Sequence, residues 1–450
     1  MDINQAHRIY FLGIGGIGMS ALARYFLWLG KQVYGYDRTS TDLTMQLEKE
    51  GAVINYTDTE EVLPVETDLV IYTPAIPKEN RQFVFFKNSP VKMMKRSEML
   101  GQIAAGIPTI AVAGTHGKTT VASIIAHIFK TAKMDFVSFV GGISANYDTN
   151  FIVSGKPRWA IVEADEFDRS FLQLKPRVAV ITSMDADHLD VYGTMDQLKE
   201  SFTLFTQKVE PGGHLIMKDK LGMTAPENVM IEKYGTANQA RFRMLNPVIE
   251  EGKYHCAFTE GNQEYPVKFG GAGLHNLENA LAAAAASRMA GISWENIQQA
   301  LGTFKGVKRR FEIICAGGKS VFIDDYAHHP EEIAACVRSA RALFPKKKIT
   351  GIFQPHLYSR TRDLADGFGE ALGMLDQVVV MDIYPARELP IEGVSAHSIL
   401  DKIDLPEKYF VPDKDLLEFV NANRFEVLIT MGAGNIDKFV KPIKALLDKS

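Results

Sequence analysis

A glycine-rich segment in the middle of the chain has the residue types of a phosphate-binding loop. Glycines let backbone N–H groups turn toward a phosphate, and the N-terminus of a following helix adds positive potential. We expect Lys118 to reach the terminal phosphates and the Thr119 hydroxyl to bind Mg²⁺. Val112 replaces the first glycine of the full pattern, so a glycine-rich turn with a surface lysine is the alternative. The segment follows an apolar stretch and comprises Gly114, Thr115, His116, Gly117, Lys118, Thr119 and Thr120.

Acidic residues follow the next two predicted strands. Carboxylates that converge beside a phosphate loop repel each other unless a cation lies between them. The pattern therefore predicts a metal site next to the loop, and the alternative is a set of solvated loop charges. Together with one histidine, the residues concerned are Glu163, Asp165, Glu166, Asp185, Asp187 and His188.

A second glycine loop, GIGGIG at 13–18, lies between a predicted strand and a predicted helix near the N-terminus. This pattern is typical of a diphosphate bound at a helix N-terminus, and Asp37 lies near the spacing of a ribose-binding acid. A dinucleotide and a UDP-sugar both carry such a diphosphate. The loop alone therefore leaves an NAD-dependent dehydrogenase and a UDP-sugar enzyme as alternatives.

Two polar clusters occur in the last third of the chain. The stretches DDYAHHP at 324–330 and QPHLYSRTR at 354–362 each follow a predicted strand and open a predicted helix. Ligands of open α/β sheets bind at the carboxyl ends of strands, so both clusters are candidate binding residues. Helix capping and a charge pair at the start of a helix are the alternative explanation.

Strand and helix patterns alternate along the chain, which favours mostly parallel sheets with helices on their faces. Short alternating stretches between 241 and 270 predict antiparallel hairpins appended to the central sheet. The predicted fold class is α/β, with three domains at 1–106, 107–315 and 316–450. Strands are predicted at 8–12, 32–37, 68–73, 109–113, 159–163, 177–182, 320–324, 349–353, 377–381 and 426–430, and helices at 17–29, 97–105, 196–208 and 276–290.

Composition limits the possible partners. The 450 residues carry a net charge of −4, which provides no basic field for a nucleic-acid backbone. The three cysteines form no CxxC pair, which fits a reducing compartment and argues against a zinc site. The apolar stretch 9–30 begins with a strand-like segment and is broken by glycines at 13, 15, 16 and 18, so we expect neither a membrane span nor a signal peptide. We expect a cytoplasmic protein with small-molecule substrates, and the sequence leaves open whether it is a monomer or a homodimer.

The chain resembles the Mur ligases from about Arg8 to Asn435. The motifs occur in the family's order, and the set is more specific than either phosphate loop alone. They are GIGGIG, GTHGKTT, EADEFDRSF, DHLDVY, GLHNLENALAA, KRRFE, DDYAHHP, QPHLYSRTRD and GAGN. The resemblance implies a Rossmann-like N-terminal domain for a UDP-sugar, a central P-loop ATPase-like domain for ATP, and a Rossmann-like C-terminal domain for the amino acid.

The motifs look most like those of family members that join L-alanine to UDP-N-acetylmuramate, through an acyl phosphate, in peptidoglycan precursor synthesis. The alternative within the family joins a murein tripeptide to the same UDP-sugar. Two alternatives come from other classes: an NAD-dependent dehydrogenase, which the second phosphate loop argues against, and a non-catalytic ATP-dependent binding module, which leaves the acidic cluster without a role.

The resemblance also implies roles for residues on the ATP side. Thr119, Glu163 and His188 are implied to bind metal, and the catalytic residues are Lys118, Arg310 and His328, with His328 as a candidate base for the amine. Besides the loop residues 114–120, the implied ATP-binding residues are His275, Asn276, Asn279, Arg310, Asp324 and Asp325.

The other two substrates have implied residues as well. His328, His356 and Arg360 are implied to lie near the amino acid, with Arg360 as the carboxylate clamp. The UDP-sugar is implied to bind at Gly13, Gly15, Gly16, Ile17, Gly18, Asp37 and Thr73.

Two positions depart from the family's pattern. Related ligases carry a carbamylated lysine near the position of Thr203, and Lys199 is only a neighbour, so we expect no such lysine here. Leu357 stands where many relatives have an arginine, so one contact to the amino-acid carboxylate is in doubt.

Overall fold

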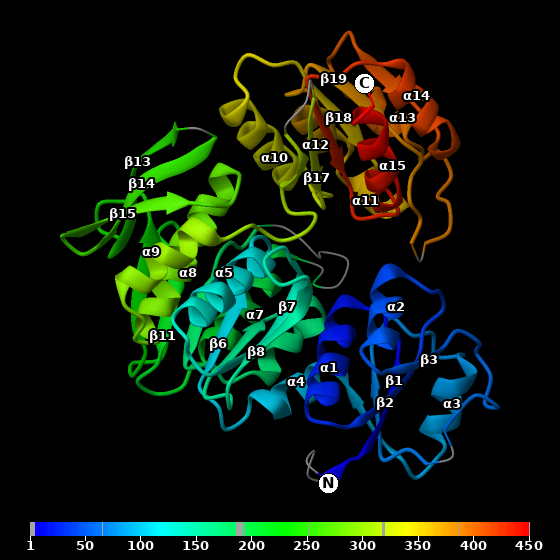
Figure 1. The fold of residues 1–450 in the computed structure, drawn as a ribbon, viewed down its shortest axis with the longest axis vertical. Helices are drawn as coiled ribbons and strands as arrows, with labels where there is room; N and C mark the ends of the chain where they lie inside the picture. The colour runs from blue at the N-terminus through cyan, green and yellow to red at the C-terminus, as the bar shows by residue number, and fades with distance from the viewer. Residues whose placement is uncertain are drawn as a thin grey trace. The chain divides into compact units, whose positions relative to one another are not determined.

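The structure, a computed structural model, describes residues 5–64, 66–185, 192, 194–250, 252–316, 320–386 and 388–449. Its strands form three sheets with helices packed beside them (Figure 1). By compactness the chain divides into two units, each made of three segments of the chain. The first unit is Met1–Leu245, Phe258–Tyr265 and Asn279–Leu301, and the second is Asn246–Ala257, Pro266–Glu278 and Gly302–Ser450.

The first sheet is parallel, with the strand order β3-β2-β1-β4-β5. Because β1 lies between β2 and β4, the strand order reverses at its carboxyl end, where open α/β sheets bind ligands. The glycine loop at 13–18 leaves β1 at this point. The strands are β1 (Arg8–Leu12), β2 (Gln32–Tyr36), β3 (Val53–Asn55), β4 (Leu69–Tyr72) and β5 (Lys92–Lys95), and the helices are α1 (Ile17–Trp28), α2 (Asp42–Lys49), α3 (Arg81–Lys87) and α4 (Arg96–Ala104).

The second sheet is mixed and has the order β15-β14-β13-β12-β11-β10-β6-β9-β7-β8. Strand β6 (Thr109–Ala113) is buried throughout and lies parallel between β9 (Ala160–Glu163) and β10 (Val178–Ile181). At one edge β8 (Thr149–Ser154) runs antiparallel to β7 (Phe136–Ser144). The other elements are β11 (His214–Lys218), β12 (Met230–Gly235), β13 (Phe242–Glu250), β14 (Lys253–Glu260), β15 (Gln263–Phe269), α5 (Lys118–Thr131), the 3-10 helix η2 (Phe167–Gln173), α7 (Met195–Thr206), α8 (Leu274–Met289) and α9 (Trp294–Thr303).

The third sheet has the order β16-β17-β21-β18-β19-β20. All neighbours are parallel except β16, which runs antiparallel to β17. Its strands are β16 (Glu312–Cys315), β17 (Val321–Asp325), β18 (Ile349–Phe353), β19 (Gln377–Val380), β20 (Lys408–Phe410) and β21 (Val427–Met431). The helices are α10 (Pro330–Leu343), α11 (Tyr358–Asp363), α12 (Ala365–Leu372), α13 (His397–Leu400), α14 (Leu416–Ala422) and α15 (Asp437–Leu447).

The predicted α/β fold class is confirmed, since each of the three sheets consists largely of parallel strands with helices beside them. Three predicted strands, at 8–12, 109–113 and 349–353, have the same bounds as β1, β6 and β18. The hairpin β7–β8 was missed, because Ser138 and two glycines interrupt the apolar pattern of β7.

Within the first unit, α1 packs against β7 and β8 of the second sheet. The buried Asn150 on β8 donates through Nδ2 to the Ile17 carbonyl at 2.6 Å and to Ser20 Oγ at 2.9 Å. Its Oδ1 accepts a hydrogen bond from Arg24, which also pairs with Glu50 at 2.8 Å. These contacts join the helix that follows the first glycine loop to the edge of the central sheet.

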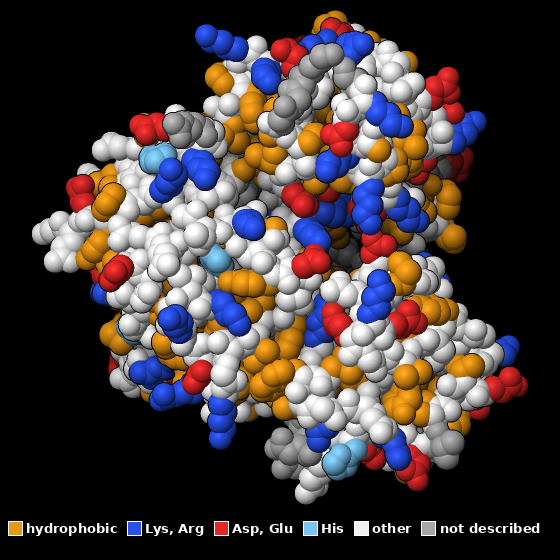
Figure 2. All heavy atoms as spheres, in the orientation of Figure 1, with side chains coloured by type: hydrophobic (Ala, Val, Ile, Leu, Met, Phe, Trp, Pro, Cys, Tyr) orange, Lys and Arg blue, Asp and Glu red, His pale blue; other side chains and the backbone are white. Residues whose placement is uncertain are grey.

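The surface carries both signs of charge. On the face drawn in Figure 2, Lys and Arg side chains are interspersed with Asp and Glu side chains. Among the residues that the structure describes, no helix combines the length and apolar character needed to cross a membrane.

Candidate active site

The phosphate loop connects β6 to α5 and depends on two glycines with positive φ. Gly114 has a φ of +132°, and a Cβ there would lie 2.1 Å from Thr182 Oγ1. Gly117 has a φ of +82° and is the N-cap residue of α5. Because glycine has no side chain to cap the helix, the N–H groups of the first turn are left for a ligand.

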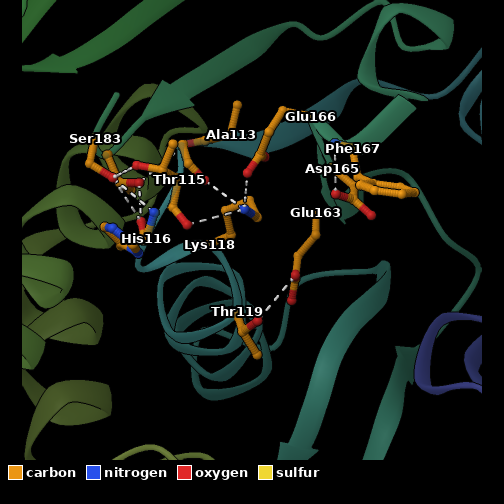
Figure 3. Close-up of polar contacts among 12 residues, drawn as sticks. Ala113, Thr115, His116, Lys118, Thr119, Glu163, Asp165, Glu166, Phe167 and Ser183 are labelled. Carbon is orange, nitrogen blue, oxygen red and sulfur yellow. Dashed lines mark hydrogen bonds and ion pairs between the residues drawn. The ribbon is translucent and has the colours of Figure 1, made fainter. Parts of the chain in front are cut away.

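The side chain of Lys118 lies in the loop and contacts an acidic partner (Figure 3). Its Nζ donates to the Gly114 carbonyl and to Glu166 Oε1, both at 2.7 Å. The Glu166 side chain is fully buried, and the Lys118 side chain is 16% exposed. The Tyr192 hydroxyl donates to the Glu166 carbonyl, which fixes the backbone at the acid.

Electrostatics keep Lys118 charged. Burial lowers the pKa of Lys118, but the carboxylates of Glu166, Asp165 and Glu163 raise it, and the net pKa lies above the ordinary value of 10.5. The protonated ammonium is the form that makes charge-assisted hydrogen bonds to phosphate oxygens. The loop therefore holds a cation where the sequence predicts a phosphate contact.

Thr119 and Glu163 lie together beside this lysine. Thr119 Oγ1 donates to Glu163 Oε2 at 3.1 Å (Figure 3). The Gly141 N–H donates to Glu163 Oε1. A hydroxyl and a carboxylate are hard oxygen donors, so their chemistry fits Mg²⁺. The other predicted ligand, His188, lies outside the described residues. Within the described stretches, no group of three or more His, Cys, Asp or Glu side chains is arranged to hold a metal.

The predicted acids do not all meet at one point. Asp165 accepts from the Phe167 N–H at 3.1 Å and pairs through Oδ2 with Arg96 Nη2 at 3.3 Å. Asp185 Oδ2 lies 3.7 Å from His116 Nε2, and Asp187 lies outside the described residues. Among the acids that the structure describes, Glu163 contacts Thr119 and Glu166 contacts Lys118.

Ser183, which the sequence prediction left out, anchors the loop. Its Oγ lies 2.9 Å from Thr115 Oγ1 and accepts from the His116 N–H at 2.8 Å (Figure 3). Thr120 is buried in the first turn of α5. The signal for Ser183 was its position directly after a predicted strand, at the same sheet edge as the loop.

Three predicted ATP-binding residues lie in the first half of α8. A Cβ at Gly117 would be 2.6 Å from Asn279 Oδ1, so this carboxamide lies against the phosphate loop. Asn276 Nδ2 donates to a backbone carbonyl at 2.7 Å, and His275 Nδ1 lies 3.0 Å from Ser339 Oγ. Burial lowers the pKa of His275 to about 4, so this imidazole is neutral at pH 7.

The first glycine loop brings its predicted residues together. The Gly15 N–H donates to Asp37 Oδ2 at 2.8 Å. Gly13 has a φ of +85°, and a Cβ there would lie 2.6 Å from Thr73 Cγ2. Gly16, the N-cap residue of α1, makes no side-chain cap, and Ile17 begins the helix. A cation that the sequence prediction left out, Arg96, lies against Gly18 in the first turn of α1.

In the second unit, two predicted catalytic residues share one acidic neighbour. The Arg310 guanidinium carbon lies 5.2 Å from the Tyr326 ring centroid, and Nη1 is 3.9 Å from Glu332 Oε1. His328 Nδ1 lies 3.0 Å from the Tyr326 carbonyl and 3.1 Å from Glu332 Oε2. Glu332 therefore contacts both the arginine and the histidine at the carboxyl end of β17.

The two acids at the end of β17 are buried. Asp325 accepts from two backbone N–H groups at 2.7 Å each, and burial raises its pKa to about 7. Asp324 accepts from Thr430 Oγ1 at 2.7 Å and Arg309 Nε at 3.2 Å, and burial raises its pKa too. Their predicted contact with the ATP ribose stays a prediction.

The QPH segment forms a second cluster in this unit. The His356 ring stacks on Tyr384 with centroids 5.8 Å apart, and it lies 6.2 Å from the His328 ring. Arg360 lies in α11, one turn after Leu357. Leu357 has a φ of +71°, an unusual value for a residue with a Cβ that costs about 1–3 kcal/mol. Such strain is common at ligand-binding segments.

Three protein-family models match consecutive parts of the chain. They are the Mur ligase family catalytic domain at residues 8–107, the Mur ligase middle domain at 112–287 and the Mur ligase glutamate ligase domain at 309–434.

Proteins named UDP-N-acetylmuramate–L-alanine ligase are similar over the full length. The one from Cytophaga hutchinsonii is 42% identical over 462 residues, covering 100% of this chain and 98% of the relative. The one from Flavobacterium psychrophilum is 45% identical over 454 residues, covering 100% of both chains.

Solved structures share the architecture. UDP-N-acetylmuramate-alanine ligase MurC from Thermotoga maritima superposes with a TM-score of 0.84 at 27% identity, covering 98% of this chain and 99% of the other. MurF ligase from the same organism, solved in complex with ADP, has a TM-score of 0.64 at 15% identity and covers 93% of this chain and 96% of the other, which indicates the fold alone.

Proposed function

Because this chain belongs to the Mur ligase family, we propose that it joins L-alanine to UDP-N-acetylmuramate while converting ATP to ADP and phosphate. The observation that carries the proposal is the identity of 42–45% over the whole chain to proteins named for this reaction. The geometry that fits it best is the loop after β6, where a lysine, a hydroxyl and a carboxylate lie together.

We divide the work among three domains. Residues 1–106 bind the UDP-sugar, residues 107–315 bind ATP and residues 316–450 bind L-alanine. UDP-sugars and ATP are cytoplasmic metabolites, so we place the reaction in the bacterial cytoplasm as a step of peptidoglycan precursor synthesis.

A carboxylate does not condense with an amine at neutral pH, because its oxygen is a poor leaving group. The lactyl carboxylate of the UDP-sugar attacks the γ-phosphorus of ATP, ADP leaves, and an acyl phosphate results. The neutral amine of L-alanine attacks the acyl carbon, and the tetrahedral intermediate expels phosphate. The nucleophiles are the substrates themselves, which accounts for a mechanism without a Ser-His-Asp or Cys-His arrangement.

The protein then has to position groups and offset charge, as in other phosphoryl transfers. Lys118 contacts the ATP phosphates from the loop, and the first-turn N–H groups of α5 face the same phosphates. Mg²⁺ held by Thr119, Glu163 and His188 would offset phosphate charge during transfer.

Residues of the C-terminal domain act on the second half of the reaction. Arg310 assists charge neutralisation, and Arg360 binds the L-alanine carboxylate with His356 nearby. His328, whose Nδ1 lies 3.1 Å from Glu332, is our candidate for the base that receives the proton of the amine.

The test is phosphate release from ATP in the presence of UDP-N-acetylmuramate, with L-alanine or L-alanyl-D-glutamyl-diaminopimelate as acceptor and products identified by mass. We expect product with L-alanine alone. Product only with the tripeptide would keep the mechanism and move the protein to peptide recycling. No product with either acceptor, together with NAD binding, would overturn the proposal.

A further inference from the structure

Arg96 lies against the first turn of the helix that follows the N-terminal glycine loop. A Cβ at Gly18 would lie 2.9 Å from Arg96 Nη1, 3.1 Å from Cδ and 3.3 Å from Cζ. The guanidinium therefore occupies the space that any side chain at position 18 would need. Gly18 has no positive φ, so a side chain at position 18 would disturb the contact with Arg96 and not the backbone conformation.

The charges around this arginine favour an anion. The N-terminus of α1 has positive potential, and its first turn contains no acidic residue. A guanidinium beside the positive end of a helix is repelled unless negative charge lies close by. Asp165 supplies part of that charge through a 3.3 Å contact, and Asp37 accepts from Gly15 in the loop.

The contact between Arg96 and Asp165 leaves donor capacity for a ligand. It is a single contact between side chains that are 24% and 38% exposed, and exposed pairs contribute only about 0–1 kcal/mol. A guanidinium has five N–H donors, and its contacts to phosphate are often paired and stronger. Asp165 itself is fixed by the Phe167 N–H, so it holds the guanidinium near the loop.

We propose that Arg96 binds the diphosphate of the UDP-sugar, and that Asp165 is the positioning residue that holds the guanidinium beside Gly18. The inference rests on the proposed function, because it names a further contact of the same UDP-sugar site. Arg96 begins helix α4, directly after strand β5 of the N-terminal sheet, and Asp165 follows the strand that carries Glu163. The pair therefore joins the UDP-sugar loop to the strand end beside the phosphate loop.

Calorimetric titration with UDP tests the contact, since UDP carries the diphosphate without the sugar. We expect Arg96→Gln to weaken UDP binding 10- to 100-fold and Arg96→Lys to retain part of the affinity, because lysine keeps the charge but loses the paired geometry. Arg81→Gln, which removes an exposed arginine from the same sheet's helices, is the matched control and leaves UDP binding unchanged.

Steady-state kinetics distinguish a loss of UDP-sugar binding from a general loss of folded structure. Arg96→Gln should raise the KM for UDP-N-acetylmuramate at least tenfold while the KM for ATP changes less than twofold, and Asp165→Asn should give a smaller change of the same kind. UDP binding by Arg96→Gln at wild-type affinity would overturn the inference. So would an equal loss of UDP and ATP binding with a lowered Tm, because that pattern indicates a structural role.

The outcome for the wild-type chain separates the two proposals. If the wild type binds UDP through Arg96 but does not ligate L-alanine, the proposed function fails and the diphosphate contact stands. If the wild type binds neither UDP nor UDP-N-acetylmuramate, the inference fails together with the proposed function.

Discussion

Lys118 and Glu166 form an ion pair at the phosphate loop, and the acid is fully buried. Removing one partner of a buried pair leaves an uncompensated charge, which costs about 3–5 kcal/mol. A substitution at Lys118 therefore has two effects: loss of a phosphate contact and destabilisation by Glu166. The two effects need to be measured separately.

We expect Lys118→Ala to abolish phosphate release from ATP and to lower the Tm. The double variant Lys118→Ala with Glu166→Gln should regain most of the lost stability while remaining inactive, because the buried charge is gone and the phosphate contact is still missing. Differential scanning calorimetry and the phosphate-release assay measure the two properties. Turnover in either variant would contradict the role given to Lys118.

Gly114 is a second residue of the phosphate loop at which a substitution should affect both stability and ATP binding. Its φ of +132° disfavours any other residue, and a Cβ would lie 2.1 Å from Thr182 Oγ1. We expect Gly114→Ala to destabilise the protein by about 2–4 kcal/mol in urea unfolding and to weaken ATP binding. Gly222→Ala is the control, since a Cβ there meets nothing within 4 Å. Equal stability of the two variants would contradict the packing argument.

For individual residues, the sequence predicted the members of the two glycine loops but not the side chains that contact these loops from elsewhere in the chain. The glycine loop and Lys118 are local patterns, and both lie at strand-to-helix turns as predicted. Arg96 and Ser183 were missed, because they meet Gly18 and the loop only through the order of strands in the sheets. His188 was predicted to be a metal ligand, and it lies outside the described residues.

Among the elements, the buried parallel strands were the most predictable. Their apolar runs are continuous because both faces are covered, as in β6, where every residue is buried. The hairpin β7–β8, where Ser138 and two glycines interrupt the apolar pattern, and the short edge strands β16 and β20 were missed. Edge strands bury less apolar surface than central strands, so a wider range of residue types occurs in them and their sequence predicts a strand less clearly.

The edge hairpin matters because β8 carries Asn150, whose buried side chain bonds to α1. We expect Asn150→Ala to destabilise the protein by about 2–4 kcal/mol, since it leaves the Ser20 hydroxyl and Arg24 without this partner. Chemical denaturation of the variant measures the loss. Asn262→Ala, at an exposed turn, is the control and should change the stability by less than about 0.5 kcal/mol. A small effect at Asn150 would mean that packing alone holds α1.

For the whole molecule, global stability should depend on pH through a buried histidine. Burial lowers the pKa of His127 from 6.5 to about 4, while its Nδ1 lies 2.6 Å from the Tyr147 hydroxyl. The unfolded chain takes up this proton near pH 6.5, whereas the folded protein does so only near pH 4. His127 therefore removes stability as the pH falls through this interval, by about 3 kcal/mol in total.

We expect His127→Gln to flatten the dependence of the unfolding free energy on pH between 6.5 and 4, the interval set by these two pKa values. Urea unfolding at several pH values gives the slope for the variant and the wild type. His397→Gln, at an exposed position, is the control variant. Identical slopes for His127→Gln and the wild type would contradict the assignment.

The contacts of α1 with the central sheet also affect whether the N-terminal sheet can be separated from the rest of the chain. The ring centroid of Tyr25 in α1 lies 5.6 Å from that of Phe139 and 6.2 Å from that of Phe151. Asn150 donates a hydrogen bond to the same helix. A fragment ending at Gly106 would expose these aromatic and polar groups to water. The N-terminal sheet, although complete in its strands, is therefore not an interchangeable part: transplanting it into another ligase would require the matching β7–β8 hairpin to move with it.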